Sequence, residues 1–547
     1  MTILTTIHKY RFQLIRYLSI VLMAGACQSS NLPESDNKAE KPNIILIMSD
    51  DMGYSDLGCY GGEINTPNLD YLAKNGLQFT QFYNTARCCP TRASLLTGLY
   101  PHQAGIGHMT NPPGNPTGHN YGFAEYQGSL SKNTRTIAEV LGDVGYTTLM
   151  SGKWHLGMEN STQWPLQRGF DKYYGILSGA SNYFKPVHPR GITEQNEQIE
   201  ISDEQFYTTD AFTKKAIDFI GETKEAPFFL YLAYTSPHWP IQAPKGEIDK
   251  YRNKYLEGWA KLREARYKRQ QELGLIDSQW ELSPQDGKDW ESLPKEKQEE
   301  MALRMAIYAA QVDRMDQNVG KLINYLKETN KLDNTLIIFL DDNGACAEGG
   351  MLGGGSADLL ETREGFFLTY GQSWANASNT PFREYKHYIH EGGISTPLIV
   401  HWPAGIDQAK QGSKVKQYGF LPDIMATLVD LSGATYSQNS NIPPMQGESL
   451  LPIIKGAKAN IHEKPIFWEH EGNKAVRLGK YKLVMKWKDK DSNHWELYDI
   501  DADRSEQHDL AAQIPDKVSE MQAMWEEWAS ANNVKPWNEI IDILSSK

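Results

Sequence analysis

The stretch Asn43–Asp51, with the sequence NIILIMSDD, decides the fold prediction. Its segment from Ile44 to Met48 is apolar throughout and has the length of a β-strand. Strands without polar alternation are typical of parallel sheets, whose two faces are both covered by helices. Asp50 and Asp51 follow directly. We therefore expect a strand that is buried on both faces and that ends in a pair of carboxylates.

Further apolar runs of strand length recur along the chain, at residues 146–150, 228–234, 335–340 and 397–401. Helical stretches lie between them. One helix should begin at Thr66-Pro67, because proline is favoured in a first helical turn. Another should begin at Thr136, because Thr136 and Glu139 have capping-box spacing. This alternation predicts an α/β fold in which a large, mixed but mostly parallel sheet is sandwiched by helices.

The second half of the chain contains two stretches whose composition and hydrophobic pattern differ from the strand-helix alternation. Residues 246–326 are highly charged, and we interpret them as an insertion followed by a helix over 299–326. After residue 435, the segments KAVRLGKYKLVMKW and HWELYDI predict a short antiparallel meander, and residues 516–531 a closing amphipathic helix. We therefore expect an α/β domain at residues 42–435 and a small C-terminal α+β domain with an antiparallel sheet at 436–547.

The first 27 residues have the pattern of an export signal. A basic leader precedes an apolar stretch, residues 17–26, that is too short to span a membrane. The small residues before Cys27 resemble a bacterial lipoprotein cleavage site, with Cys27 as the lipidated residue; an ordinary secretory signal is the alternative. Residues 28–41 are interpreted as a polar linker. These features predict an exported bacterial protein, either periplasmic or anchored to a membrane as a lipoprotein, without fixing which membrane or face.

The bulk composition excludes one class of partner. The chain has 547 residues and a formal net charge of -13. Nucleic-acid binding needs basic surface that displaces counterions, so we expect no nucleic-acid partner. An acidic protein can still contain a local cationic pocket for an anionic substrate. Four cysteines remain after Cys27, which are too few for a disulfide scaffold.

Oxygen-bearing side chains follow two of the predicted strands. Asp50 and Asp51 end the first, and Asp342 and Asn343 follow the run at 335–340. The carboxyl ends of parallel strands meet at one edge of a sheet, where ligands bind. Carboxylates that share a pocket repel one another unless a cation lies between them. Oxygen ligands favour Ca²⁺ or Mg²⁺ over zinc, so the pattern indicates a site for a hard divalent cation.

Cationic side chains are expected at the same edge. Lys153 and His155 follow the run at 146–150, and His238 follows the run at 228–234. Arg92 and Lys386 complete the group. A divalent cation beside several cationic side chains is suited to a multiply charged oxyanion.

Each of these residues, taken alone, also fits a structural role. The Asp50-Asp51 pair fits a turn or helix cap, and DDNG fits a hairpin turn. His238 could be a packed loop residue, and Lys386 a solvated lysine. The joint pattern favours a site.

The stretch Cys88-Cys89-Pro90-Thr91-Arg92, followed by Thr97-Gly98, resembles the signature of the type I sulfatases, which belong to the alkaline-phosphatase superfamily. The segments DDMGYSDLGCYGG, TPNLDYLAKNG, GKWHLG, SPHWP, DDNG, EGGISTP and WELYDI extend the resemblance over nearly the whole chain after the leader. The similarity is closest to the bacterial arylsulfatases. The resemblance implies an alkaline-phosphatase-like sheet in a catalytic domain, and a sulfatase that hydrolyses aryl sulfates or sulfated carbohydrates.

The resemblance also implies a modification and a metal. A formylglycine-generating maturation enzyme that reads Cys-x-Pro-x-Arg would oxidise Cys88 to Cα-formylglycine. Cys89 occupies the variable second position, where we expect a buried packing residue. One Ca²⁺ per chain is implied, with Mg²⁺ less favoured. Its ligands would be Asp50, Asp51, residue 88, Asp342 and Asn343.

The resemblance also implies catalytic roles, which are assigned to residues of this chain only by their matching positions in the family motifs. A hydroxyl of the hydrated aldehyde would attack sulfur, held by the metal and Arg92, with Asp342 accepting its proton. Lys153, Lys386 and the metal would stabilise the sulfate oxygens. His238, with Lys386, would protonate the leaving alcohol. His155 would then remove a proton from the second hydroxyl, which expels sulfate and regenerates the aldehyde.

Two other functions fit parts of the pattern. One is a phosphonate monoester or phosphodiester hydrolase of the same superfamily, and the other is an inactive sugar-binding lipoprotein. The sequence does not identify the natural substrate or the oligomeric state. Residues 246–294 and 351–382 are candidate specificity loops. Tyr183, Phe184 and Trp374 either stack on a substrate ring or pack in the interior.

Overall fold

The computed structural model describes residues 41–111, 120–437, 439–457, 461–487 and 494–545. The predicted export signal at 1–27, including Cys27, lies outside the described residues, as does the predicted linker up to residue 40. Within the described parts of the chain, none of the helices combines the length and the apolar character that crossing a membrane requires.

The large sheet is mixed and mostly parallel, as predicted. Its order is β10-β2-β9-β8-β1-β7-β3-β4-β5-β6, with β11 paired to β2. Strand β1 pairs in parallel with β7 and β8, and β7 pairs in parallel with β3, whereas β9 runs antiparallel to β8 and β2. The bounds are β1 Asn43–Asp50, β2 Leu77–Tyr83, β3 Thr147–Lys153, β4 Lys172–Ile176, β5 Ile192–Glu194, β6 Glu197–Ile199, β7 Phe228–Pro237, β8 Thr335–Asp341, β9 Ser395–His401, β10 Ser413–Val415 and β11 Gly419–Phe420.

Strand β1 is buried on both faces, which explains its unbroken apolar sequence. Ile45 and Ile47 belong to one hydrophobic cluster, and Ile44, Leu46 and Met48 belong to another on the opposite face. Burying an aliphatic side chain contributes roughly 1.5–3 kcal/mol. A polar residue at any of these positions would face one of two dry interiors.

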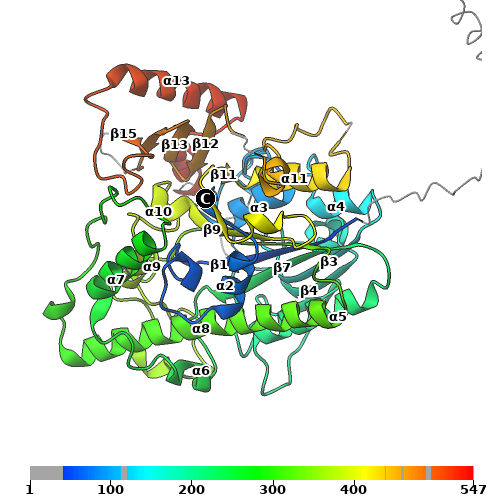
Figure 1. The fold of residues 1–547 in the computed structure, drawn as a ribbon, viewed down its shortest axis with the longest axis horizontal. Helices are drawn as coiled ribbons and strands as arrows, with labels where there is room; N and C mark the ends of the chain where they lie inside the picture. The colour runs from blue at the N-terminus through cyan, green and yellow to red at the C-terminus, as the bar shows by residue number, and fades with distance from the viewer. Residues whose placement is uncertain (1–40, 112–119, 438, 458–460, 488–493, 546–547) are drawn as a thin grey trace, which may run out of the picture. The chain divides into compact units, whose positions relative to one another are not determined.

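Helices cover both faces of the sheet (Figure 1). The cluster on one face includes residues of α2, α5 and α8, and the other includes residues of α3, α4 and α11. The capping box at Thr136 and Glu139 forms both of its bonds at the start of α4. The bounds are α2 Pro67–Lys74, α3 Cys88–Thr97, α4 Ile137–Gly142, α5 Thr208–Glu222, α6 Lys245–Asp249, α7 Gly258–Glu272, α8 Lys295–Glu328, α9 Gln372–Ser378, α10 Glu391–Ile394, α11 Pro422–Ser432 and α12 Leu451–Ile454.

A second, four-stranded antiparallel sheet follows in sequence, and it confirms the predicted meander. Its first strand and the last helix were not predicted from the sequence. Its bounds are β12 Ile466–His470, β13 Asn473–Leu478, β14 Tyr481–Met485 and β15 Trp495–Asp499, with α13 Pro515–Ala531 and α14 Trp537–Ser545. Helix α13 packs on this sheet through Met521 and Trp525. The domain boundary at residue 435 stays a prediction.

Buried charges connect α10 to the second sheet. Glu391 lies 2.9 Å from the Nζ of Lys482 and 2.8 Å from the Nε of Arg504. The Lys482 Nζ also lies 2.8 Å from Glu506. All four side chains are fully buried. The network therefore fixes the start of α10, which directly follows the loop that contains Lys386.

Candidate active site

All ten predicted site residues lie together at the carboxyl edge of the large sheet. Strands β1, β3, β7 and β8 are parallel and end at this edge, and β2 runs the same way because two antiparallel pairings separate it from β8. Cys88 follows β2 in the chain and therefore lies at this edge. Lys386 precedes β9, which runs in the opposite direction, so it lies at the same edge. Each of the ten side chains is at most 5% exposed.

The first part of the site pairs two carboxylates with two cations. Lys153 Nζ lies 2.9 and 2.7 Å from the two carboxylate oxygens of Asp50. Arg92 donates to Asp342 Oδ2 at 2.8 Å and lies 3.6 Å from Asp50. Gly152 permits the position of Lys153, because its φ is 118° and a Cβ there would lie 1.9 Å from the Ala233 carbonyl oxygen.

The second part of the site is centred on Asp51. Its backbone is left-handed, with φ at 69°. Its Oδ1 accepts a hydrogen bond from Asn343 Nδ2 at 2.7 Å and lies 2.7 Å from Lys386 Nζ, and its Oδ2 lies 3.3 Å from His238 Nε2. Burial raises the pKa of Asp51, but His238 and Lys386 more than offset it and lower the pKa to about 2. Asp51 is therefore held as a carboxylate.

The acidic residues fit a hard metal cation. Ligand atoms of Asp50, Cys88 and Asp342 lie within 4.8 Å of one another. Burial and the neighbouring Asp342 raise the pKa of Asp50 well above its usual range, which is the effect that a bound cation would relieve. Asn343 Oδ1 is buried and has no hydrogen-bond partner among the described residues. A group of carboxylates with a neutral amide oxygen matches the preference of Ca²⁺ or Mg²⁺.

Cys88 begins helix α3 and lies among the cations. A hydrogen bond from the Cys89 thiol lowers the pKa of Cys88, and Lys153, Lys386 and His155 lower it further against burial. The Cys89 Sγ packs in the interior, 3.5 Å from the His108 carbonyl oxygen and 3.3 Å from the Thr110 amide nitrogen.

The two histidines are both buried and are held differently. The Nδ1 of His238 lies 2.7 Å from the Trp239 carbonyl oxygen, so Nε2 is left to face Asp51 and Lys386. Burial lowers the pKa of His238 to about 4. The Nε2 of His155 lies 3.0 Å from the Thr110 carbonyl oxygen, and burial lowers the pKa of His155 too. Both can therefore be neutral at neutral pH.

Comparison with known proteins decides the family, since residues 42–434 match the sulfatase family. The chain belongs to the sulfatase family. Residues 383–531 also match the C-terminal region of N-sulphoglucosamine sulphohydrolase. A sulfatase of Schizosaccharomyces pombe is 35% identical over 530 residues, which cover 89% of this chain and 93% of that protein. The arylsulfatase of Klebsiella aerogenes is 34% identical over 460 residues, 80% of this chain and 95% of that enzyme.

A solved structure shows the same architecture. Ps i-CgsB, whose crystal structure contains k-i-k-neocarrahexaose, is 27% identical to this sulfatase with a TM-score of 0.67, over 91% of this chain and 94% of that one. The resemblance to sulfatases is thus confirmed, and the protein is a sulfuric ester hydrolase.

The structure of the sulfatase adds residues that the sequence did not single out. Tyr231 lies within the apolar run of β7, and its hydroxyl accepts from Arg92 NH1 at 3.3 Å. Arg87 lies 3.1 Å from Glu348, which accepts a 2.8 Å hydrogen bond from Trp239 Nε1. Arg87 precedes Cys88 and Trp239 follows His238. Both could therefore have been predicted only from their position next to a predicted site residue.

Two of the candidate stacking residues pack in the interior of the sulfatase instead. Trp374 is fully buried, and its ring packs edge-on against Trp259 and Trp290 of the predicted insertion. Tyr183 is 1% exposed, and its hydroxyl donates to the carbonyl oxygens of Thr235 and His238. Phe184 is partly buried against Tyr207.

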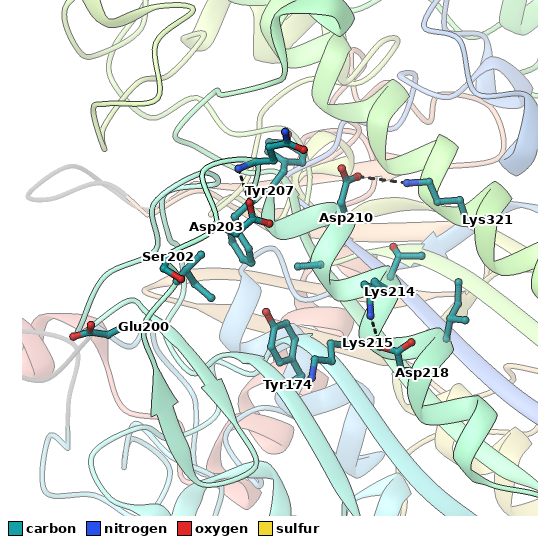
Figure 2. A pocket seen from close by; sticks show the side chains of 16 residues that line it. Tyr174, Glu200, Ser202, Asp203, Tyr207, Asp210, Lys214, Lys215, Asp218 and Lys321 are labelled. Atoms are coloured by element: carbon teal, nitrogen blue, oxygen red, sulfur yellow. Dashed lines mark hydrogen bonds and ion pairs between the residues drawn. The ribbon is translucent and has the colours of Figure 1, made fainter.

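A cavity of about 660 Å³ lies apart from the predicted site, between α5 and residues 200–207 (Figure 2). None of the ten predicted site residues lines it. Its charges are paired locally, as Lys214 lies 2.7 Å from Asp218 and Lys321 lies 3.8 Å from Asp210. The cavity therefore offers no concentrated charge of one sign.

Proposed function

We propose that this sulfatase hydrolyses sulfate monoesters, either aryl sulfates or sulfated carbohydrates, to an alcohol and inorganic sulfate. The nucleophile is Cα-formylglycine made from Cys88, and one Ca²⁺ serves as cofactor. The convergence of Asp50, Asp342 and several cations on the Cys88 sulfur carries this proposal. The Klebsiella arylsulfatase supports the aryl class, and the oligosaccharide bound to Ps i-CgsB supports the carbohydrate class.

The metal would be held by residue 88 together with four oxygen donors, Asp50, Asp51, Asp342 and Asn343. When bound, it supplies positive charge to the sulfate oxygens and to the hydrated aldehyde. A set of several protein donors favours Ca²⁺, which takes six to eight oxygen ligands, over Mg²⁺, which usually keeps several waters and is bound through one or two carboxylates. The unpartnered Oδ1 of Asn343 gives the amide an oxygen to contribute.

The hydrated aldehyde supplies one hydroxyl for attack on sulfur and a second for release of sulfate. Asp342 Oδ2, already bonded to Arg92, accepts the proton of the attacking hydroxyl. Lys153 and Lys386 bind the sulfate oxygens through their ammonium groups. They are placed to do so because each is held against a carboxylate.

The two histidines transfer the other protons of the reaction, at the leaving oxygen and at the second hydroxyl of residue 88. His238 Nε2 lies 3.4 Å from Lys386 Nζ, so it takes a proton from the Lys386 ammonium and passes it to the leaving oxygen. His155 is held through Nε2, and its Nδ1 is buried without a hydrogen-bond partner among the described residues. His155 accepts the proton of the remaining hydroxyl at the release step.

Cys88→Ala tests this function when sulfate release from an aryl sulfate is measured after co-expression with a formylglycine-generating enzyme. The parent should be active and Cys88→Ala silent. Cys89→Ala is the matched control, because it removes the adjacent buried thiol, and it should stay active. Equal release by the parent and by Cys88→Ala would refute the nucleophile. If the aldehyde is found at residue 88 by mass spectrometry but aryl sulfate is not cleaved, the aryl class is refuted, and sulfated glycans and phosphonate esters are the next substrates to assay.

The exported location and the lipid at Cys27 are parts of the same proposal. A sulfatase that acts on glycans outside the cell would need both export and access to the maturation enzyme before export. Labelling with a radioactive fatty acid, with Cys27→Ala as control, tests the lipid directly.

A further inference from the structure

An aromatic shelf, made of Trp239, Phe366 and Phe367, lies beside the predicted site. Phe366 and Phe367 are 37% and 44% exposed. Their ring centroids each lie 5.1 Å from that of Trp239, in edge-on contacts. Single exposed apolar residues are ordinary, but exposed rings gathered on one tryptophan form a patch of the kind that binds ligands.

The shelf is held in place by its surroundings. The residue after Phe367, Leu368, is buried, and its carbonyl accepts from the Ile241 amide at 2.8 Å. Trp239 Nε1 donates to Glu348 at 2.8 Å. Phe367 packs over Gly354, where a Cβ would lie 2.8 Å from its ring. A surface fixed in this way loses little conformational freedom when it binds a ring.

The position of the shelf indicates which part of a substrate it meets. Trp239 follows His238, and their ring centroids lie 4.6 Å apart. Under the proposed function, His238 protonates the oxygen that leaves sulfur. The group attached to that oxygen must therefore leave the buried site on the side of His238, where the shelf begins.

Two arginines on the loops beside the shelf form no ion pair with a carboxylate among the described residues. The guanidinium of Arg190 lies 4.8 Å from the Phe366 ring centroid, and that of Arg363 lies 5.0 Å from the Phe184 ring centroid. Arg190 NH1 donates to the Ala180 carbonyl oxygen at 3.1 Å, and Arg363 NH1 donates to the Glu204 carbonyl oxygen, so both guanidinium groups are held by neutral acceptors. Their loops are tied together, since Asn182 donates to the carbonyls of Arg363 and Gly365. In a chain of net charge -13, two arginines on neighbouring loops without a carboxylate partner indicate an anionic ligand.

We propose that the shelf, with Arg190 and Arg363, binds the leaving part of the substrate, and that this part is a sulfated oligosaccharide with a second anionic group. A sugar ring packs on the aromatic faces, and the second sulfate or carboxylate meets the arginines. An aryl sulfate has a ring for the shelf but no second anion for the arginines. This inference rests on the proposed function for the position of the leaving oxygen.

Calorimetry on Cys88→Ala tests the inference, because this variant binds without turnover. The probes are two matched pairs: iota-type against kappa-type neocarrabiose, and D-glucosamine-2-N,6-O-disulfate against D-glucosamine-6-O-sulfate. In at least one pair the disulfated member should bind about tenfold more tightly, since a charge-assisted bond contributes roughly 1.5 kcal/mol or more. Equal affinity within both pairs would refute the second anionic group.

Two further variants in the Cys88→Ala background separate the two parts of the surface. Phe366→Ala with Phe367→Ala should weaken both members of the binding pair about tenfold, the range of aromatic contacts. Arg190→Gln with Arg363→Gln should weaken only the disulfated member and remove the difference. Leu256→Ala, at another exposed apolar residue (45%), and Lys261→Gln, at an exposed cation, are the matched controls. Unchanged affinities in both double variants would refute the site.

The proposed function and this inference can fail separately. If the parent releases sulfate from aryl sulfates but neither glycan pair binds Cys88→Ala, the glycan inference is refuted and the sulfatase mechanism stands. If the glycans bind and depend on the shelf, but Cys88→Ala and the parent release sulfate equally, the nucleophile is refuted and the binding site stands.

Discussion

Replacing Lys482 by methionine should destabilise the protein strongly, although Lys482 lies far from Cys88 in sequence. Its Nζ is fully buried between Glu391, at 2.9 Å, and Glu506, at 2.8 Å. Methionine fills much of the aliphatic volume but removes the charge. Glu391 keeps its 2.8 Å contact with Arg504, whereas Glu506 loses its ion pair and retains the 2.8 Å hydrogen bond from the Glu391 amide.

The magnitude follows from that asymmetry. Removing one partner of a buried ion pair costs about 3–5 kcal/mol, because the other charge stays buried without compensation. Only one of the two carboxylates is left without a cation, so the cost should stay within that range and not double. Lys480→Met is the matched control: Lys480 is 48% exposed and lies 2.6 Å from Asp499. Exposed pairs of this kind contribute about 0–1 kcal/mol.

Urea unfolding followed by tryptophan fluorescence measures both variants. The midpoint of Lys482→Met should fall well below that of Lys480→Met, with similar slopes. Lowering the pH protonates the unpaired carboxyl, so the deficit relative to the parent should shrink. Equal midpoints for the two variants, or a deficit that grows as the pH falls, would refute the reasoning.

Three further predictions follow from the fold and the site. Thr136→Ala removes one bond of the α4 capping box and should lower the free energy of unfolding by about 1 kcal/mol, measured by urea denaturation. Burial raises the pKa of Glu391, but Lys482 and Arg504 lower it from 4.5 to about 2. The resulting stability of about 3 kcal/mol is present above pH 4.5 and lost as the pH falls toward 2; a flat acid titration of unfolding would contradict this. EGTA should abolish sulfate release and Ca²⁺ restore it; equal restoration by Mg²⁺ would contradict the calcium assignment.

The parts of the site that were predictable from sequence are those fixed by strand ends. Asp50, Lys153 and Asp342 each end or follow an apolar run, and parallel pairing alone places such residues at one edge. Cys88 and Arg92 were found through a motif, and the topology explains afterwards why α3 begins at that edge.

The parts that were not predictable depend on tertiary contacts. In the sequence, Tyr231 is indistinguishable from the other apolar residues of β7. The sequence of a strand that is buried on both faces does not indicate which of its side chains contacts Arg92. Trp374 and Phe367 are both aromatic residues of the same candidate loop. One packs against Trp259 and the other is 44% exposed, and local sequence does not distinguish them.

The charges of the site explain how an acidic protein can bind a sulfate ester. Three carboxylates, Asp50, Asp51 and Asp342, face three cations, Arg92, Lys153 and Lys386, so their formal charges cancel. A divalent cation held there would leave the site with two positive charges. A sulfate monoester brings one negative charge, and passing the proton of the attacking hydroxyl to Asp342 leaves the total charge unchanged. The site therefore stays positive and attracts an anionic ester, although the whole chain has a net charge of -13. Neutral histidines at the positions that move protons add no further positive charge to this buried site.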